Sequence, residues 1–453
     1  MEADSLSKAG LFSYYGAMAS IIEPRVLKGF RDFLPADQGQ REQLIDRLKA
    51  TFRKYGFLPI DTPILEYTEV LLGKGGGETD KQVYRFEDKG GRDVAMRFDL
   101  TVPFARYMAA HLSELYLPFR RYHIDKVFRG ENTQRGRYRE FMQCDFDIVG
   151  PTGVSADFEI LQLIAASMES LGVEKYHIHL SHRGVFNAFL QRLDLAGASE
   201  TILRTVDKLG KIGREKTAKL LGDVVHQEKA EEILRYIEAE GEYLEALLQL
   251  QELAGGESEE TRRLRGLFEL AEAIGLEGRL VLDPSVTRGL DYYTGVVFET
   301  FLDELPGIGS VCSGGRYDNL ASLYTKEVLP GVGASVGLDR LVAALSEIGA
   351  KSTEERGAEL IVLNLDSSLE PRYHRIASEF RKAGISTEVY PEQKKLARQF
   401  SYAERKGIPL GIVCGEDEES RGVVNLRFLE TRESRDGMEL EAAISLAKSA
   451  LRQ

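Results

Sequence analysis

The spacing of hydrophobic residues changes at Gly56, where a helical pattern gives way to an extended one. The apolar positions of residues 38–55 recur at helical spacing and are Leu44, Leu48, Phe52 and Tyr55. They predict an amphipathic helix that ends at Gly56. Residues 57–67 are typical of a strand, although Pro59 and Pro63 interrupt it. Because proline has no backbone donor, we expect this strand at a sheet edge or at a subunit interface.

Residues 119–149 predict a long antiparallel hairpin with a polar loop at residues 130–136. The return strand alternates, which is typical of a strand with two different faces. Its apolar face holds Met142, Cys144, Phe146 and Ile148. Its polar face holds Gln143, Asp145 and Asp147 and, nearer the loop, Arg137, Arg139 and Phe141.

The polar face of this return strand has two interpretations. Exposure to solvent is the simpler one, because antiparallel sheets commonly have one wet face. The alternative is a binding site. Cations at one end of the face and carboxylates at the other suit a ligand that is anionic at one end and basic at the other.

A segment without proline runs from residue 152 to residue 283. Leu, Ala, Glu and Lys dominate much of it, especially residues 196–275. This composition predicts an α-rich insertion, at about residues 190–278, between two sheet-forming segments. The pair Gly255-Gly256 is the clearest break inside it and predicts a helix boundary.

A polar run, residues 288–295, lies between the apolar segments 280–282 and 296–301. It contains a cation, an anion, two tyrosines and two glycines. Burying unpaired polar groups costs several kcal/mol, so polar groups in such surroundings usually line a site. By composition alone, a hairpin with Thr294-Gly295 as its turn is the simpler interpretation.

Residues 331–345 predict a strand of small residues that leads into a helix. Small residues let a ligand or another backbone approach closely. Arg340 then lies in the first turn of the helix, beside Asp339. A lone Gly-x-Gly is weak support for nucleotide binding, and close packing is the simpler explanation.

After residue 355 the pattern becomes an alternation of strands and helices. The strands are expected at residues 359–365, 386–390, 410–414 and 423–428, and the helices near residues 370–383, 394–405 and 438–451. This alternation predicts a small α/β domain with a largely parallel sheet. Residues 391–408 contain five basic and two acidic residues together with Phe400 and Tyr402. A solvated helix face is the default interpretation, and contact with nucleic acid is the more specific one.

Composition limits the class of protein. The chain has 453 residues, 43% of them hydrophobic and 29% charged, which is typical of a globular protein with roughly two to four domains. No apolar run approaches the ~20 residues that span a bilayer. The first 25 residues resemble neither a signal nor a transit peptide, and we expect residues 1–24 to form a flexible extension.

The cysteines and the charge add two further limits. Cys144, Cys312 and Cys414 are isolated, so neither a zinc cluster nor a disulfide framework is expected, which fits the reducing cytoplasm. The net charge of −13 argues against a general nucleic-acid coat protein, although a local basic patch is compatible with it.

Taken in order along the chain, five segments resemble those of the histidyl-tRNA synthetases, a family of class II aminoacyl-tRNA synthetases. Those similar to class II motifs 1, 2 and 3 are residues 57–67, 128–141 and 333–340. Those that indicate histidine are residues 288–293 and 313–318. The resemblance covers nearly the whole chain from about residue 25.

The resemblance implies an α/β fold with three expected parts. Residues 25–350 form an α+β catalytic domain, built on the antiparallel sheet of class II synthetases with its helices. The α-rich insertion at about residues 190–278 interrupts this domain. Residues 357–453 form a C-terminal α/β anticodon-binding domain.

The implied activity is ATP-dependent conversion of L-histidine to histidyl-adenylate, followed by transfer to the 3′ end of tRNA(His). Charge develops on the α-phosphate during the first step, so fixed cations are needed there. By the resemblance, Arg129 and Arg288 are the catalytic residues, and Arg288 contacts the α-phosphate where related enzymes use a metal ion. ATP would be held by Arg129, by Glu131 at the adenine edge, by Phe141 stacked on adenine and by Arg340 at its far end.

The resemblance also assigns a set of histidine-binding residues. They are Asp99, Leu100, Thr101, Arg129, Gln143, Asp147, Arg288, Tyr292 and Tyr293. Asp99 with Thr101 would meet the α-ammonium group, and Gln143 the carboxylate or the amine. Asp147 and Tyr293 would hold the two nitrogens of the imidazole ring.

Residues 99–101 depart from the pattern of many bacterial members, which have Glu-Gly-Thr where this chain has Asp-Leu-Thr. In this respect the chain is similar to the eukaryotic-like branch of the family. The negative charge is kept, but its reach is one methylene shorter.

Further partners follow from the resemblance. In the motif 2 loop, Gln134 and Arg135 would face the acceptor end of tRNA, and Lys394, Lys395 and Arg398 would face tRNA from the C-terminal domain. The chain would form a homodimer through motif 1, in the cytoplasm and away from membranes. Mg²⁺ is expected with ATP, although the sequence indicates no protein ligands for it.

Two alternatives differ in function. One is a catalytically inactive relative that serves as a regulatory subunit or as a sensor of histidine or tRNA. Against it, the C-terminal domain is present, as are Arg129, Arg288 and Arg340. The other is a synthetase for a different amino acid, which residues 288–293 and 313–318 disfavour.

Overall fold

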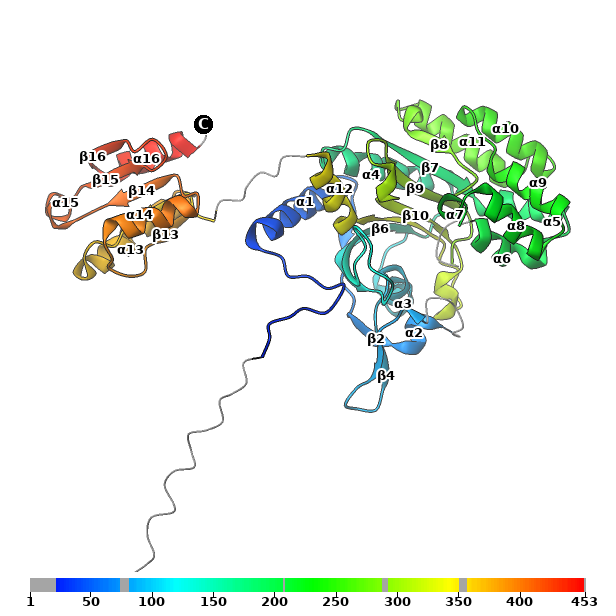
Figure 1. Cartoon of the computed structure of the whole chain (residues 1–453), viewed down its shortest axis with the longest axis horizontal. Coiled ribbons are helices and arrows are strands. Elements are labelled where there is room, and N and C mark those ends of the chain that lie inside the picture. The colour runs from blue at the N-terminus through cyan, green and yellow to red at the C-terminus, as the bar shows by residue number, and fades with distance from the viewer. Residues whose placement is uncertain (1–21, 74–80, 207, 287–291, 350–356, 452–453) are drawn as a thin grey trace, which may run out of the picture. The chain divides into compact units, whose positions relative to one another are not determined.

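The structure, a computed structural model, describes residues 22–73, 81–206, 208–286, 292–349 and 357–451 (Figure 1). The chain divides into two compact units, Met1–Lys351 and Ser352–Gln453. Most of the expected extension at residues 1–24 lies outside the described residues. In the part that is described, no helix is both long enough and apolar enough to cross a membrane.

An eight-stranded sheet forms the centre of the first unit. In spatial order its strands are β1 (Leu58–Pro59), β5 (Phe119–Phe128), β6 (Glu140–Val149), β11 (Gly331–Gly337), β10 (Cys312–Tyr317), β9 (Val296–Leu302), β7 (Tyr176–His182) and β8 (Leu280–Leu282). The six central strands pair antiparallel, and β1 and β8 add a parallel strand at each edge. The predicted hairpin of residues 119–149 is confirmed as β5 and β6.

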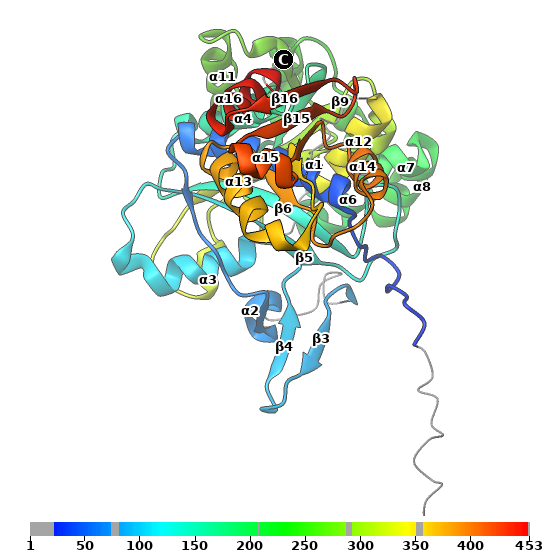
Figure 2. The same ribbon diagram turned by 90° about the vertical axis from the view of Figure 1, so that its left-hand side faces the viewer.

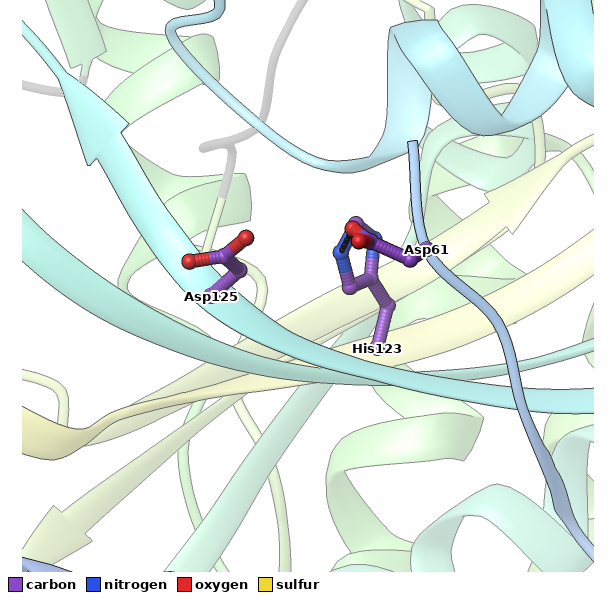
Figure 3. Close-up of side chains that lie close together, drawn as sticks. All are labelled: Asp61, His123 and Asp125. Carbon is purple, nitrogen blue, oxygen red and sulfur yellow. Dashed lines mark hydrogen bonds and ion pairs between the residues drawn. The ribbon is translucent and has the colours of Figure 1, made fainter. Parts of the chain in front are cut away.

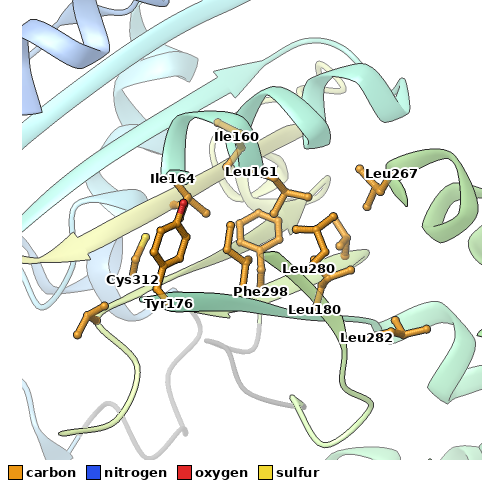
Figure 4. Packing of buried hydrophobic residues seen from close by; sticks show 14 of the residues in the cluster. Ile160, Leu161, Ile164, Tyr176, Leu180, Leu267, Leu280, Leu282, Phe298 and Cys312 are labelled. Carbon is orange, nitrogen blue, oxygen red and sulfur yellow. The ribbon is translucent and has the colours of Figure 1, made fainter. Parts of the chain in front are cut away.

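The apolar face of this sheet is covered by helices α1 (Pro35–Lys54), α4 (Val154–Ser170) and α12 (Leu338–Ile348) (Figure 1). The alternation of β6 explains the contact, because Cys144, Phe146 and Ile148 all belong to the buried core. The rings of Phe52 on α1 and Phe146 on β6 have centroids 5.0 Å apart. Figure 4 shows Ile160, Leu161 and Ile164 of α4 beside Tyr176 and Phe298 of the sheet. The opposite face of the sheet is therefore left for polar residues.

The predicted α-rich segment consists mainly of seven helices. They are α5 (Arg183–Arg192), α6 (Ser199–Val206), α7 (Leu209–Ile212), α8 (Arg214–Val224), α9 (Gln227–Ile237), α10 (Tyr243–Ala254) and α11 (Glu259–Glu272). Figure 1 shows them gathered beside strands β7 and β8. The predicted helix boundary is confirmed, since α10 ends at Gly255, whose φ of +103° favours glycine.

One strand within the proline-free segment was not predicted. Residues 176–182 form β7, the strand between β9 and β8. Tyr176, Ile178 and Leu180 alternate with polar residues, and this period of two is the signal that identifies the strand. The helical composition around it hides so short a pattern.

Two expectations about neighbouring strands are wrong. The segments before and after residues 288–295 do not form a hairpin, because β8 pairs with β7 and not with β9. Residues 57–67 form not one strand but two, β1 and β2 (Leu65–Tyr67), which belong to different sheets. The edge position expected from proline is confirmed for β1, which contains Pro59.

A small three-stranded sheet completes the first unit. Its strands, in spatial order, are β2, β4 (Asp93–Met96) and β3 (Arg85–Glu87), and the helices nearby are α2 (Thr68–Leu72) and α3 (Thr101–His111). Strands β3 and β4 project from the body of the unit as a hairpin (Figure 2). In the described residues the short 3₁₀ helices include η2 (Leu112–Glu114), η3 (Ala196–Ala198), η4 (Glu277–Arg279), η5 (Pro306–Ile308), η6 (Leu320–Leu323) and η7 (Ser367–Leu369).

The second unit is a five-stranded sheet with helices. Its strands, in spatial order, are β13 (Thr387–Val389), β12 (Leu360–Val362), β14 (Leu410–Val413), β15 (Val424–Phe428) and β16 (Ser434–Met438). Its helices are α13 (Glu370–Lys382), α14 (Leu396–Arg405), α15 (Glu416–Arg421) and α16 (Leu440–Leu451). The expected largely parallel sheet is wrong, because β14–β15 and β15–β16 are antiparallel. Strand β16 was not predicted, because its polar sequence lacks the usual apolar alternation.

Candidate active site

A cavity of about 720 Å³ lies on the polar face of the large sheet. Ten of the predicted site residues line it: Asp99, Thr101, Arg129, Glu131, Phe141, Gln143, Asp147, Tyr292, Tyr293 and Arg340. They come from β6, α3 and α12 and from the segments before α3, after β5 and before β9. Solvent exposure of this polar face was the simpler interpretation, and it is wrong, since Asp145 and Asp147 are buried.

The remaining predicted site residues lie elsewhere. Leu100 is fully buried and does not line the cavity, and its expected contact with histidine stays a prediction. Arg288 lies outside the described residues. Arg135 lies on the motif 2 loop, where its guanidinium is 2.5 Å from the carboxylate of Glu347, and the neighbouring Gln134 does not line the cavity either. In the second unit the predicted tRNA-facing residues, Lys394, Lys395 and Arg398, are exposed.

Three buried carboxylates, those of Asp99, Asp145 and Asp147, gather at one end of the cavity. Burial raises the pKa of Asp99 to about 6, although the backbone N–H of Val102 and the nearby Arg129 oppose the rise. Burial raises the pKa of Asp145 to about 7 and also raises that of Asp147. A concentration of buried negative charge favours a cationic ligand group at this end.

The side chain of Asp147 is held by neighbours on two strands. The hydroxyl of Tyr317 on β10 donates a hydrogen bond of 2.5 Å to Oδ1 of Asp147. Gly333 on β11 lies directly across from Asp147, and a Cβ atom at residue 333 would overlap with that carboxylate. The small residues of β11 therefore make room for a protein side chain in the cavity wall.

Gln143 lines the cavity beside Asp145, with its Nε2 at 3.5 Å from Oδ1 of that carboxylate. Its Nε2 donates to the hydroxyl of Ser335 at 3.0 Å. Its Oε1 is buried and has no hydrogen-bond partner among the described residues. An acceptor without a partner suits a ligand ammonium group better than a carboxylate.

The other end of the cavity is cationic and aromatic. Arg129 donates from Nε to the carbonyl oxygen of Phe98 at 2.9 Å, and its guanidinium lies 5.1 Å from the ring centroid of Phe141. Arg340 donates from Nη1 to the carbonyl oxygen of Ser310 at 2.5 Å. Two guanidinium groups and an aromatic face thus line the same cavity, a combination that suits a nucleotide triphosphate.

The start of α12 is fixed to the hairpin by Asp339. Its Oδ2 accepts a hydrogen bond of 2.7 Å from the backbone N–H of Met142, and its Oδ1 lies 2.6 Å from Nη1 of Arg41. Arg31 pairs with the same carboxylate. Asp339 therefore fixes the start of α12, where the neighbouring Arg340 lies.

Residues 313–318 contribute to the site in a way that the sequence did not indicate. Gly314 and Tyr317 line the cavity, but Arg316 points to the opposite face of the sheet. There its guanidinium donates to Oδ1 of Asp157 on α4, at 2.8 Å from Nε and 2.6 Å from Nη2. Arg316 is thus part of the core that supports the cavity.

Sequence reasoning missed three residues of the site: Asp145, Tyr317 and Arg121. Asp145 was placed on the polar face but given no role. Arg121 lies directly across from Asp147 in the hairpin register. Counting outward from the loop gives the register of the two strands, and this register is the signal that could have found Arg121.

An antiparallel sheet with helices on one face and a cavity on the other is the catalytic architecture of class II aminoacyl-tRNA synthetases. The cavity has an arginine from the hairpin, Arg129, and another from the start of α12, Arg340. A family model described as histidyl-tRNA synthetase matches residues 29–341, and a model described as an anticodon binding domain matches residues 359–449. The chain belongs to the histidyl-tRNA synthetase family, as its sequence predicted.

Relatives agree with this assignment. The histidine–tRNA ligase of Treponema denticola is 55% identical over 406 residues, which cover 88% of this chain and 91% of that protein. The histidine–tRNA ligase of Rhodopirellula baltica is 50% identical over 422 residues, covering 92% and 96%. The crystal structure of histidyl-tRNA synthetase from Nostoc sp. PCC 7120 has a TM-score of 0.82 at 31% identity and covers 95% of this chain and 100% of that chain. The predicted fold class is confirmed, and the chain is an enzyme of the ligase class.

Proposed function

We propose that this cavity forms histidyl-adenylate from L-histidine and ATP, and that the enzyme then transfers the histidyl group to the 3′ end of tRNA(His). The observation that supports this most directly is that one cavity is lined both by three buried carboxylates and by two arginines, Arg129 and Arg340. The carboxylates suit the ammonium group and ring of histidine. The arginines suit the phosphates of ATP.

Histidine would lie at the carboxylate end. Asp99 and the free Oε1 of Gln143 would accept hydrogen bonds from the α-ammonium group, and Thr101 lies beside Asp99. Asp147 and Tyr293 would hold the imidazole ring, with Tyr292 packed against Tyr293 at a ring distance of 4.9 Å. A site that pairs both ring nitrogens rejects apolar analogues, because its own polar groups would then lack partners.

Gly333→Ala should lower kcat/KM for histidine about 100-fold, because a displaced contact at a reacting ligand is costly. The added Cβ would overlap with Asp147 and would lie 2.8 Å from the carbonyl oxygen of Phe146. Steady-state kinetics of ATP–pyrophosphate exchange would measure the change. Gly153→Ala is the matched control, since Gly153 has a φ of −71° and no neighbour within 4 Å of an added Cβ. Equal kinetics for the two variants would contradict the proposed position of histidine.

ATP would lie at the arginine end. The histidine carboxylate attacks the α-phosphate, a new O–P bond forms, and pyrophosphate leaves with the electron pair of the broken bond. Arg129 would stabilise the charge that develops on the α-phosphate, and Arg340 would bind the far end of the triphosphate. Phe141 would stack on adenine, and Glu131 would hold its edge. By the resemblance alone, Arg288 adds a second cation at the α-phosphate.

A divalent metal usually accompanies ATP in this class of enzyme, and we propose Mg²⁺. The ion is commonly held by one or two carboxylates together with phosphates and water. Glu299 lines the cavity and would supply such a carboxylate. Bound there, Mg²⁺ would offset negative charge on the phosphates.

For the transfer step, the second unit and the motif 2 loop would bind tRNA. We place Lys394, Lys395 and Arg398 on the tRNA-facing surface, because all three are exposed. The segment that carries them is held by Gln399, which is fully buried and donates 2.7 Å to the carbonyl oxygen of Lys394. On the loop, Gln134 and Arg135 would approach the acceptor end.

We also propose a homodimer through motif 1 and a cytoplasmic location. Four large apolar side chains of this motif are exposed: Leu58, Ile64, Leu65 and Tyr67. Such a patch on edge strands is typical of an interface. The three free and buried cysteines favour a reducing compartment. We further propose residues 25–350 as the catalytic domain, with the α-rich insertion at about residues 190–278, and residues 357–453 as the anticodon-binding domain.

The purified protein should catalyse ATP–pyrophosphate exchange that depends on L-histidine. It should also attach labelled histidine to tRNA(His). Exchange with another amino acid but not with histidine would overturn the proposed substrate. Binding of histidine or tRNA without any exchange would instead favour the regulatory or sensor alternative.

A further inference from the structure

Arg121 is a fully buried cation behind the carboxylate end of the cavity. It lies on β5 directly across from Asp147 on β6. Its Nη2 is 2.7 Å from Oδ2 of Asp147, and its guanidinium lies 4.1 Å from the ring centroid of Phe104 on α3. The guanidinium is therefore held between an aromatic face and the carboxylate that lines the cavity.

Structural stability does not explain this guanidinium. None of its three nitrogens has an aligned hydrogen bond to any residue that the structure describes. Its short contact with Asp147 is therefore an ion pair whose N–H groups do not point at the oxygen. A buried ion pair without well-aligned hydrogen bonds contributes little to folding, because the desolvation of both charges opposes it.

Arg121 instead acts on the charges around the histidine end. It lowers the pKa values of Asp99, Asp145 and Asp147, and in each case burial raises the pKa more strongly than Arg121 lowers it. Burial raises the pKa of Tyr317, the donor to Asp147, and the nearby Asp147 raises it further. Arg129 also lowers the pKa of Asp99, but among the described residues Arg121 is the cation that acts on all three carboxylates and opposes their protonation.

The next residues on the same face of β5 do not add a cation. His123 is buried, and burial together with Arg121 and Arg97 lowers its pKa to about 4, so its ring is neutral near pH 7. Figure 3 shows His123 beside Asp61 and Asp125, three side chains whose ligand atoms lie within 4.8 Å of one another. Asp125 is already paired with Arg97 at 2.5 Å. The two guanidinium groups disfavour a metal ion in this cluster, and Arg121 is the one cation on this face of β5, whose residues are all described.

We propose that Arg121 is a positioning residue for histidine recognition: it keeps Asp147 ionised and oriented, so that this carboxylate accepts a hydrogen bond from the imidazole ring. The inference depends on the proposed function of the cavity. A protonated Asp147 would lose its negative charge and part of its acceptor capacity, so it would pair more weakly with the ring N–H. The donor from Tyr317 and the ion pair with Arg121 leave the other lone pairs of Asp147 for the ligand.

Arg121→Met tests the role of the charge. Its kcat/KM for histidine should fall about 100-fold, mostly through KM, while the KM for ATP stays within about twofold. Since Arg121 lowers the pKa of Asp147, its loss raises that pKa, and Asp147 is ionised only at higher pH. In the pH profile of kcat/KM for histidine, the acidic limb should therefore move up by about one pH unit or more. Both quantities come from ATP–pyrophosphate exchange between pH 5.5 and pH 9.

Three comparisons separate this role from general damage. Arg121→Lys keeps the charge and should keep the acidic limb close to that of the wild type, even if KM rises. Arg120→Met is the matched control, since Arg120 lies next along β5 and pairs with Glu159 outside the cavity. Inhibition by β-(2-thienyl)alanine, whose ring has no N–H, should change little in Arg121→Met.

The outcomes are distinct. A wild-type protein that fails to exchange with histidine would overturn the proposed function itself. An active wild type with Arg121→Met kinetics equal to those of Arg120→Met would overturn the inference alone. Equal losses for histidine, ATP and the thienyl analogue, without a shift of the acidic limb, would also overturn it. If Arg121→Met does not fold, Arg121→Lys alone tests the proposal. An acidic limb that moves up by about one pH unit in Arg121→Lys would then contradict it, because this variant keeps the charge.

Discussion

Arg129→Ala should slow histidine-dependent ATP–pyrophosphate exchange about 1,000-fold, the scale expected when a cation at a phosphoryl-transfer centre is removed. Arg129 follows directly after β5 and lines the arginine end of the cavity. Its Nε is fixed on the carbonyl oxygen of Phe98, so the guanidinium does not have to reorganise during the reaction. The loss should appear in kcat, because the charge on the α-phosphate develops in the transition state.

Rapid-quench measurement of adenylate formation would separate this effect from substrate binding. Arg129→Lys should recover part of the rate, since it restores a charge without the planar fork. Arg53→Ala, an exposed arginine at the end of α1, is the matched control and should behave as the wild type. A loss confined to the KM for histidine would contradict the proposed action of Arg129 on the phosphate.

Arg316→Met should destabilise the first unit by about 3 kcal/mol, because it leaves Asp157 buried without its closest partner. Asp157 is 0% exposed and accepts both hydrogen bonds from Arg316. Burial raises the pKa of Asp157, and Arg316 and then Arg263 lower it. Since Arg263 remains 3.3 Å from this carboxylate, the effect lies at the lower end of the range for broken buried pairs.

Calorimetry would measure this effect as a lower melting temperature for the transition that belongs to the first unit. The double variant Arg316→Met, Asp157→Leu removes both charges and should recover most of the loss. The exchange rate of Arg316→Met at low temperature should stay close to that of the wild type. If Arg316→Met had normal stability but lost most of its activity, we would instead infer that Arg316 takes part in the reaction.

The elements with a strong period were predicted well from the sequence. The apolar spacing of residues 38–55 gave helix α1, with Leu44, Leu48 and Phe52 buried. The alternation of residues 142–148 predicted which face of β6 would join the core. The polar β16 and the short β7 were not predicted, because their local hydrophobic pattern is weak. Pairing with neighbouring strands stabilises them instead.

The candidate site was predicted mostly by resemblance of motifs. Ten of those residues line one cavity, although they come from segments as distant as Asp99 and Arg340. Leu100 differs from its neighbours Asp99 and Thr101, because its side chain is buried and does not line the cavity. Arg316 lies beside Tyr317 in sequence, yet the two point to opposite faces of β10.

By itself, the sequence determined the family, the alternation of the hairpin and the residue types that activation of an amino acid needs. These are local properties, since the period of a strand and the chemistry of a motif are set by neighbouring residues. Only the tertiary structure decided that Arg121 pairs with Asp147, that Gly333 makes room for that carboxylate and that Asp157 receives Arg316. The alternation of a strand predicts on which face each side chain lies. The element packed against that face comes from elsewhere in the chain, and it decides the partner, the burial and the charge of the side chain.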